Sequence, residues 1–199
     1  MATAAMPRRS VGRPRSQASR LAILETAYEH LKSRPFAAIS PLHIANEAGV
    51  SSATVYRWWS TKEALLLDAA LYKIEEELVL GSEGLPMERL KNYVLQVGKI
   101  FTGENGIVVA RIVTAVQDNP TLRREFLRRV YTPKDKELRI VVDQAIAQGE
   151  LPMEMEVSTF LDAIYGPLLA RLLLRHEEID DAFVVRVFDT VVAGIRQLN

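Results

Sequence analysis

The sequence predicts an all-α protein with a small three-helix head at the N-terminus and a larger helical body. Apolar residues recur at the spacing of amphipathic helices, about 3.6 residues, along most of the chain. No alternating β-branched run bounded by hairpin turns accompanies them. With 199 residues, of which 48% are hydrophobic and 25% charged, the chain can bury a real core.

The first predicted helix begins near Ser16 and ends before Pro35. Its inward stripe is Leu21, Leu24, Tyr28 and Leu31. A short second helix starts at Ser40-Pro41, where a capping hydroxyl precedes a proline suited to the first helical position. Gly49 ends it, because glycine readily adopts the left-handed conformation that follows a helix.

The third helix and the body helices are delimited by similar signals. Ser51 is expected to cap a short helix whose inner residue is Val55. Ser60 and Glu63 fit a capping box at the start of a longer helix. Further helices are expected over 87–102, 105–117, 119–148 (where Pro133 can interrupt), 154–176 and 180–197.

Two short helices joined by a glycine-centred turn, resting on a longer helix, form a helix-turn-helix. Its second helix lies in the major groove of DNA. Residues 51–62, SSATVYRWWSTK, are rich in hydroxyl and cationic donors suited to phosphates and base edges. We expect an exposed Trp58 to face DNA and Trp59, about 100° further round the helix, to pack inward. The alternative is a helix-turn-helix whose hydroxyls are merely solvated.

Charge is divided unevenly along the chain. The formal net charge is zero, yet residues 1–62 carry nine Lys/Arg against three Asp/Glu. The first fifteen residues hold four arginines and no acid, and the stretch VGRPR resembles arms that enter a narrow minor groove. We therefore predict a basic flexible arm over 1–15, with Arg13 and Arg15 on DNA, and a DNA-binding domain over 16–62. Scattered surface charge is the alternative.

Residues 40–66, SPLHIANEAGVSSATVYRWWSTKEALL, resemble the N-terminal signature of tetracycline-repressor (TetR) family regulators. The matching residues are Ile44, Ala45, Ala48, Gly49, Val50, Ser51, Thr54, Tyr56, Lys62, Glu63 and Leu65. The triplet Arg57-Trp58-Trp59 departs from the pattern, in which many members carry Tyr-Phe or His-Phe. The resemblance implies phosphate contacts by Ser51, Thr54, Tyr56 and Lys62. It implies base contacts by Ser52, Ala53, Arg57 and Trp58.

The body, residues 63–199, is expected to dimerise, because a helix-turn-helix normally reads DNA as two copies one helical turn apart. The last two helices are the candidates, since their apolar faces are too wide for lone surface helices. The final helix offers Ile179, Phe183, Val184, Val187, Phe188, Val191, Val192 and Ile195. A wholly intramolecular core is the alternative.

The resemblance also implies a small-molecule effector held among the middle helices, a common place for a cavity. Polar residues within apolar stretches are the candidate lining: Gln96, Arg111, Gln117, Asp162, Tyr165 and Arg171. Gly166-Pro167 favours a kink that can open space beside Tyr165. A structural or surface role is the alternative for each.

Other classes of function find little support. The absence of cysteine excludes disulfides and thiolate chemistry. The three histidines lie far apart, and no metal, serine-nucleophile or phosphate-loop motif appears, so we expect no enzyme, metal or cofactor. Neither an apolar run of ~18 residues nor a secretory signal is found, which favours a cytoplasmic protein without a membrane span. The prediction is a ligand-responsive repressor that binds a palindromic operator as a dimer. The alternative is a constitutive DNA-binding protein whose body only dimerises.

Overall fold

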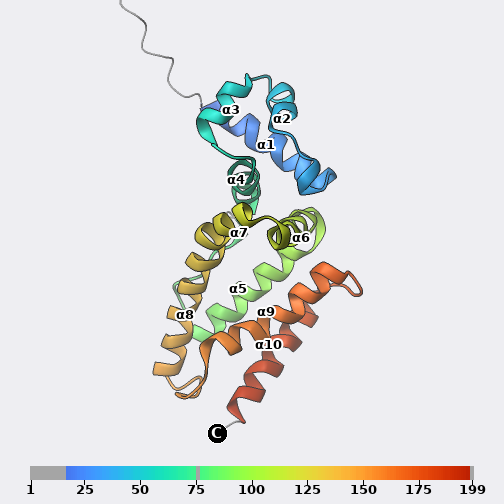
Figure 1. Cartoon of the computed structure of the whole chain (residues 1–199). Coiled ribbons are helices and arrows are strands. Elements are labelled where there is room, and N and C mark those ends of the chain that lie inside the picture. The colour runs from blue at the N-terminus through green and yellow to red at the C-terminus, as the bar shows by residue number, and fades with distance from the viewer. Residues whose placement is uncertain (1–16, 75–76, 198–199) are drawn as a thin grey trace, which may run out of the picture.

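The computed structural model describes residues 17–74 and 77–197, and every regular element in these ranges is helical (Figure 1). The all-α prediction is confirmed. Arg13 and Arg15 of the predicted arm lie outside the described residues. The head comprises α1 (Gln17–Ser33), the short 3-10 helix η1 (Phe36–Ala38), α2 (Pro41–Glu47), α3 (Ser52–Trp58) and α4 (Lys62–Ile74).

The two ends of the helix-turn-helix follow their local sequence signals. Gly49 follows α2 with a φ of 66°, the left-handed conformation that glycine adopts without steric cost. The hydroxyl of Ser51 accepts the backbone N–H of Thr54 at 3.2 Å and so caps α3. Both predictions are confirmed.

The start of α4 differs from the prediction. The N–H of Ala64 is accepted by the hydroxyl of Thr61 at 3.1 Å, so Thr61 supplies the capping hydroxyl. The prediction of a capping box formed by Ser60 and Glu63 is therefore wrong. Glu63 instead accepts a hydrogen bond from the amide of Asn119 at 3.0 Å, which links the head to the body.

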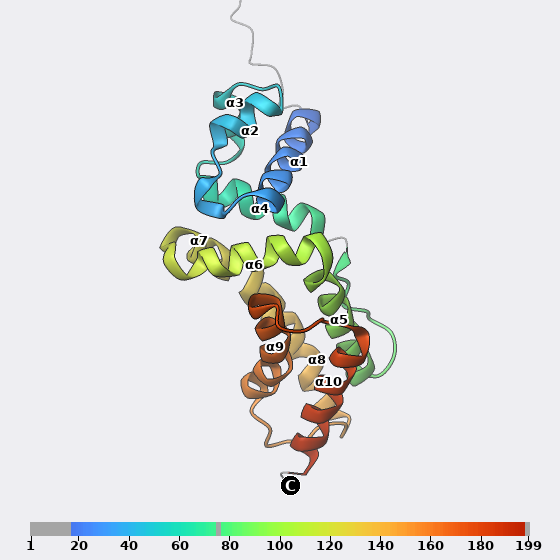
Figure 2. The same ribbon diagram turned by 90° about the vertical axis from the view of Figure 1, so that its right-hand side faces the viewer.

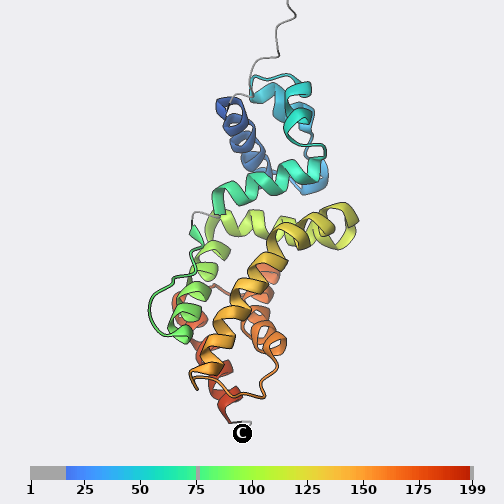
Figure 3. The same ribbon diagram turned by 90° about the vertical axis from the view of Figure 1, so that its left-hand side faces the viewer.

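The body contains six α-helices within the described residues. They are α5 (Pro86–Phe101), α6 (Gly103–Asp118), α7 (Pro120–Phe126), α8 (Thr132–Ala147), α9 (Val157–Leu174) and α10 (Asp181–Arg196). The helix expected over 119–148 is divided by a π-helical turn, η3 (Leu127–Tyr131). Pro133 cannot donate to the carbonyl four residues earlier, and the preceding turn widens accordingly. Figure 3 shows α8 descending from this point along the body.

Two apolar cores meet at α6. The first joins α1–α4 to residues of α6 and α7, including Val108, Ile112 and Leu122. The second lies among α5, α8, α9 and α10, and Ala110 of α6 belongs to it. Figure 2 shows α6 and α7 beneath α4, across the top of the body. The head therefore rests on a helix that is also part of the body.

Candidate nucleic-acid interface

Helix α3 presents one face to solvent. Val55 is its one buried residue, with 1% of its surface exposed, and it anchors the helix in the head's core. Tyr56 is 55% exposed, and Ser51, Ala53 and Arg57 are exposed beside it. Ser52 and Thr54 are half-buried. A seven-residue helix anchored at a single position leaves its outer face available to enter a groove.

The hydroxyl groups of this face form a short chain. The oxygens of Ser51 and Thr54 lie 2.9 Å apart, and the guanidinium of Arg57 lies 3.5 Å from the Thr54 hydroxyl. These contacts hold Arg57 alongside the helix. Hydroxyls and a guanidinium in this position can donate to phosphate oxygens or to the acceptor edge of guanine.

The two tryptophans have different surroundings. Trp59 is 4% exposed, and its indole N–H donates to Asp68 at 2.7 Å, so the prediction that it packs inward is confirmed. Trp58 is half-buried and packs against the head's core. The guanidinium of Arg20 lies 5.8 Å from its ring centroid. The expectation of an exposed Trp58 is therefore wrong, because Arg20 and the neighbouring indole cover part of its ring; base contact by its remaining surface stays a prediction.

Asp68, in the middle of α4, connects three elements. Besides the indole of Trp59, its carboxylate faces Arg20 of α1 at 3.8 Å and forms an ion pair with Arg129 of η3. Desolvation lowers the pKa of Arg129, which indicates a charge held partly out of water. The carboxylate therefore fixes the end of α3, α1 and the body relative to one another.

Lys62 has an intramolecular role. Its ammonium donates to the carbonyls of Phe36 and Ala37, each at 3.1 Å, and lies 5.3 Å from the ring centroid of Phe36. Two of its three N–H donors are therefore used by carbonyls of η1. Phosphate contact by Lys62 stays a prediction.

The polar residues expected to line one pocket lie at separate places in the structure, and most of them make contacts within the chain. Gln96 pairs with the backbone N–H and C=O of Val79 at 2.7 and 3.1 Å. Arg171 forms an ion pair with Glu177, and its guanidinium lies 3.4 Å from the centroid of the Phe183 ring. The other three are Arg111, which bonds to the end of α1, and the exposed Gln117 and Asp162.

Tyr165 of α9 is different from these residues. Its hydroxyl is buried and has no hydrogen-bond partner among the described residues. Burial raises the pKa of this phenol, and the nearby phenol of Tyr93 adds to the effect. Burial also raises the pKa of Tyr93, on α5, to about 12. Two phenols thus lie within the apolar core of the body, one of them unsatisfied.

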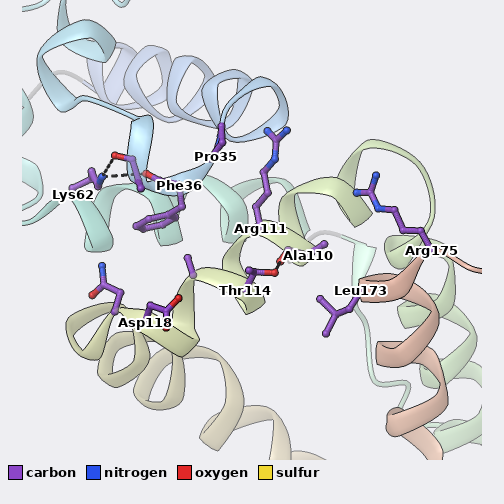
Figure 4. A pocket seen from close by; sticks show the side chains of 12 residues that line it. Pro35, Phe36, Lys62, Ala110, Arg111, Thr114, Asp118, Leu173 and Arg175 are labelled. Carbon is purple, nitrogen blue, oxygen red and sulfur yellow. Dashed lines mark hydrogen bonds between the residues drawn. The ribbon is translucent and has the colours of Figure 1, made fainter.

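A cavity of about 660 Å³ lies where the head meets the body (Figure 4). The head lines it with Pro35, Phe36, Ala37 and Lys62; the body lines it with Ala110, Arg111, Thr114, Ala115, Asp118, Asn119, Leu173 and Arg175. Of these, the sequence suggested only Arg111 as a pocket residue. No sequence motif marks the site, because its walls come from four segments far apart in the chain.

A short helix with exposed hydroxyl and cationic side chains, packed on the buried core of the other head helices, defines a helix-turn-helix regulator of transcription. The chain belongs to the tetracycline-repressor family. The family model "Bacterial regulatory proteins, tetR family" matches residues 23–69, and "Tetracyclin repressor-like, C-terminal domain" matches residues 84–191. The family prediction is confirmed.

Relatives of the chain are regulators of transcription. It is 31% identical over 185 residues to the HTH-type transcriptional regulator YdeS of Bacillus subtilis, with 93% of each chain covered. It is 45% identical over 65 residues to EthR of Mycobacterium tuberculosis, 32% of this chain and 30% of the other.

Solved structures share the fold. The TetR family regulator SCO0332 superposes with a TM-score of 0.72 at 23% identity, covering 90% of this chain and 99% of the other. FadR from Bacillus subtilis, solved in complex with stearoyl-CoA, gives 0.73 at 18% identity, covering 88% and 98%. Because both structures are no more than 23% identical in sequence to this chain, their similarity shows a shared fold alone.

Proposed function

We propose that the protein is a ligand-responsive repressor that binds a palindromic operator as a homodimer and releases it when a small-molecule effector binds. The exposed face of α3 carries the DNA-binding part of this proposal, because Val55 anchors the helix while Tyr56 and Arg57 face solvent. On this proposal Ser51, Thr54, Tyr56 and Lys62 contact phosphates, Ser52, Ala53, Arg57 and Trp58 contact bases, and Arg13 and Arg15 enter the minor groove. Such a regulator works in the cytoplasm.

The dimer is proposed to form through α9 and α10. Part of the predicted interface is used within the subunit: Val184 is buried against Gly98, where an added Cβ would lie 2.7 Å from its methyl group. Val184 is therefore removed from the proposed interface, as are the other buried residues of this face: Ile179, Phe183, Phe188 and Val192. The half-buried Val187, Val191 and Ile195 remain.

Helix α9 supports the same interface. By length and composition it is apolar enough to cross a membrane, yet only 28% of it is buried within the subunit. Its uncovered surface includes Ala163, Gly166, Pro167, Ala170, Leu173 and Leu174, the last 72% exposed. A long apolar helix left largely uncovered is expected at an obligate interface, and small residues allow a second helix to approach closely.

The unsatisfied hydroxyl of Tyr165 supports an effector site between α5 and α9. A buried hydroxyl without a partner costs about 1–3 kcal/mol, which a polar group of a ligand can offset. FadR from Bacillus subtilis, which shares the fold, was solved in complex with stearoyl-CoA, and this supports the proposal of a small-molecule effector.

The test begins with the genomic fragments that the purified protein retains. We expect these fragments to be enriched in one palindromic sequence. Gel-shift assays with metabolites of the pathways encoded beside that sequence should then find a compound that lowers the affinity of the protein for it. Ser52→Ala should change the preferred sequence, whereas Tyr56→Phe should weaken binding to all duplexes alike. Retention without sequence enrichment would contradict the proposal. An operator that no compound displaces would favour the constitutive alternative.

A further inference from the structure

The cavity between head and body has a mostly apolar lining. Phe36, Ala115 and Leu173 are among the apolar residues that line it, together with Pro35, Ala37 and Ala110. Its volume, about 660 Å³, lies within the range of small-molecule sites, about 300–1,000 Å³. The size and lining therefore suit the apolar body of a small ligand.

The charges around the cavity favour an anion. Lys62, Arg111 and Arg175 are cationic, and Asp118 is the one acidic residue among the lining residues. Figure 4 shows Lys62 and Asp118 at one end of the cavity and Leu173 and Arg175 at the other. Because an acid accompanies only the Lys62 end, the Arg175 end has an uncompensated positive charge.

The guanidinium of Arg175 has N–H donors available for a ligand. Its side chain makes no ion pair or hydrogen bond within the part of the chain that the structure describes, and Arg111 uses a single nitrogen for both of its own bonds. Arg175 ends α9 with a φ of 51°, the one non-glycine residue of the described ranges in the left-handed region. Glycine would adopt that conformation without strain, so an arginine held there points to a use for its side chain.

We propose that this cavity binds an organic anion with an apolar body, such as an aromatic carboxylate, whose carboxylate lies between Arg175 and Arg111. This site is separate from the effector site proposed around Tyr165. A guanidinium suits a carboxylate because it offers two parallel N–H donors.

Binding there acts on the connection between head and body. Arg111, on α6, donates from one nitrogen to the carbonyls of Leu31 and Arg34, at 2.5 and 3.0 Å, and so ties α6 to the end of α1. A carboxylate that draws the guanidinium away weakens these bonds and loosens the head. This regulatory consequence rests on the proposed repressor function, whereas the binding does not.

The test is calorimetric titration of the full chain with 2-naphthoate, and with 2-naphthylmethanol and 2-naphthylmethylammonium as neutral and cationic counterparts. We expect only the carboxylate to bind strongly. Thr114→Trp, which fills the cavity from an exposed position on α6, should abolish binding. Gln117→Trp, on the same helix but outside the lining, should not. Arg175→Gln should weaken binding roughly tenfold or more, as expected for a lost charged hydrogen bond, while Arg123→Gln, at an exposed position on α7, should leave it unchanged.

Circular dichroism and melting of each variant confirm that it is folded. Failure of 2-naphthoate to bind at millimolar concentration, equal affinity for the three compounds, or unchanged binding to Thr114→Trp would overturn the site. Where binding holds, 2-naphthoate should weaken operator affinity of the wild type and not of Thr114→Trp; unchanged affinity would overturn the regulatory consequence alone. Absence of any operator would count against the proposed function, and the titration would still decide the site.

Discussion

Replacing Asp68 with asparagine should loosen the head from the body while the helices remain formed. The amide oxygen can still accept the indole N–H of Trp59, but the negative charge that faces Arg129 is lost. Breaking a fully buried ion pair costs about 3–5 kcal/mol and an exposed pair about 0–1 kcal/mol. The side chain of Arg129 is 23% exposed, so we expect an intermediate loss of about 2 kcal/mol.

That loss should be visible in thermal unfolding. For a chain of this size, about 1 kcal/mol shifts the melting temperature by roughly 2–4 °C, so Asp68→Asn should melt about 4–8 °C lower. Asp68→Ala should melt lower still, because the indole N–H then loses its acceptor. Asp143→Asn, at an exposed position on α8, is the matched control.

A double-mutant cycle separates the ion pair from general disruption. Once Arg129→Gln has removed the cation, Asp68→Asn should cost much less than it does alone. Two results would show that this carboxylate does not hold the head to the body. One is an equal loss of stability from Asp68→Asn with and without Arg129→Gln, and the other is a melting temperature of Asp68→Asn equal to that of the Asp143→Asn control.

Four further predictions concern the body. Tyr165→Phe should raise the melting temperature at neutral pH, because it removes an unpartnered buried hydroxyl. The wild type should lose stability as pH rises from about 10 through about 12, since burial raises the folded pKa of Tyr93 to that value; absorbance of tyrosinate during alkaline unfolding checks this. Glu156 caps α9, and hydrogen bonds from the hydroxyl of Thr159 and from the N–H groups of Thr159 and Ser158 lower its pKa to about 2. Its contribution to stability is therefore present above about pH 4.5 and is lost as pH falls through about 2. The stability of Glu156→Gln should therefore change less with pH than that of the wild type between about pH 4.5 and 2. An equal dependence on pH in the two proteins would contradict the capping role. If the proposed dimer forms, Val191→Asp should give folded monomers with weak affinity for DNA, because the charge would be buried twice in a symmetric dimer. A folded variant that still sediments as a dimer would remove Val191 from the interface.

The sequence predicts those features whose causes lie within a few residues. Gly49 and Ser51 end and begin helices as expected because turn conformation and capping depend on adjacent backbone groups. The same reasoning failed at α4, where two neighbouring hydroxyls could each cap and Thr61 does so. Local patterns cannot separate such competitors, since both satisfy the same backbone donors.

Local sequence patterns could not predict the features that depend on segments distant in the chain. Trp58 was expected to be exposed from its polar neighbours, but Arg20 of α1 covers part of its ring. The junction cavity draws on the end of α1, the start of α4, α6 and the end of α9. Of the polar residues selected from the body, the structure distinguishes Tyr165 by the lack of a partner for its hydroxyl, which no pattern along the chain records.

The sharing of α6 between two cores limits how this regulator can be recombined with its relatives. Lys32 of α1 lies 2.8 Å from Glu104, and Val108 and Ile112 pack into the core of the head. A chimaera cut after α4 would place a foreign α6 and α7 beneath this head and so replace the body's side of that contact surface. Exchange of α1–α4 together with α6 and α7 would keep the surface intact. New operator specificities are therefore more safely introduced by substitutions on the outer face of α3 than by exchanging whole heads.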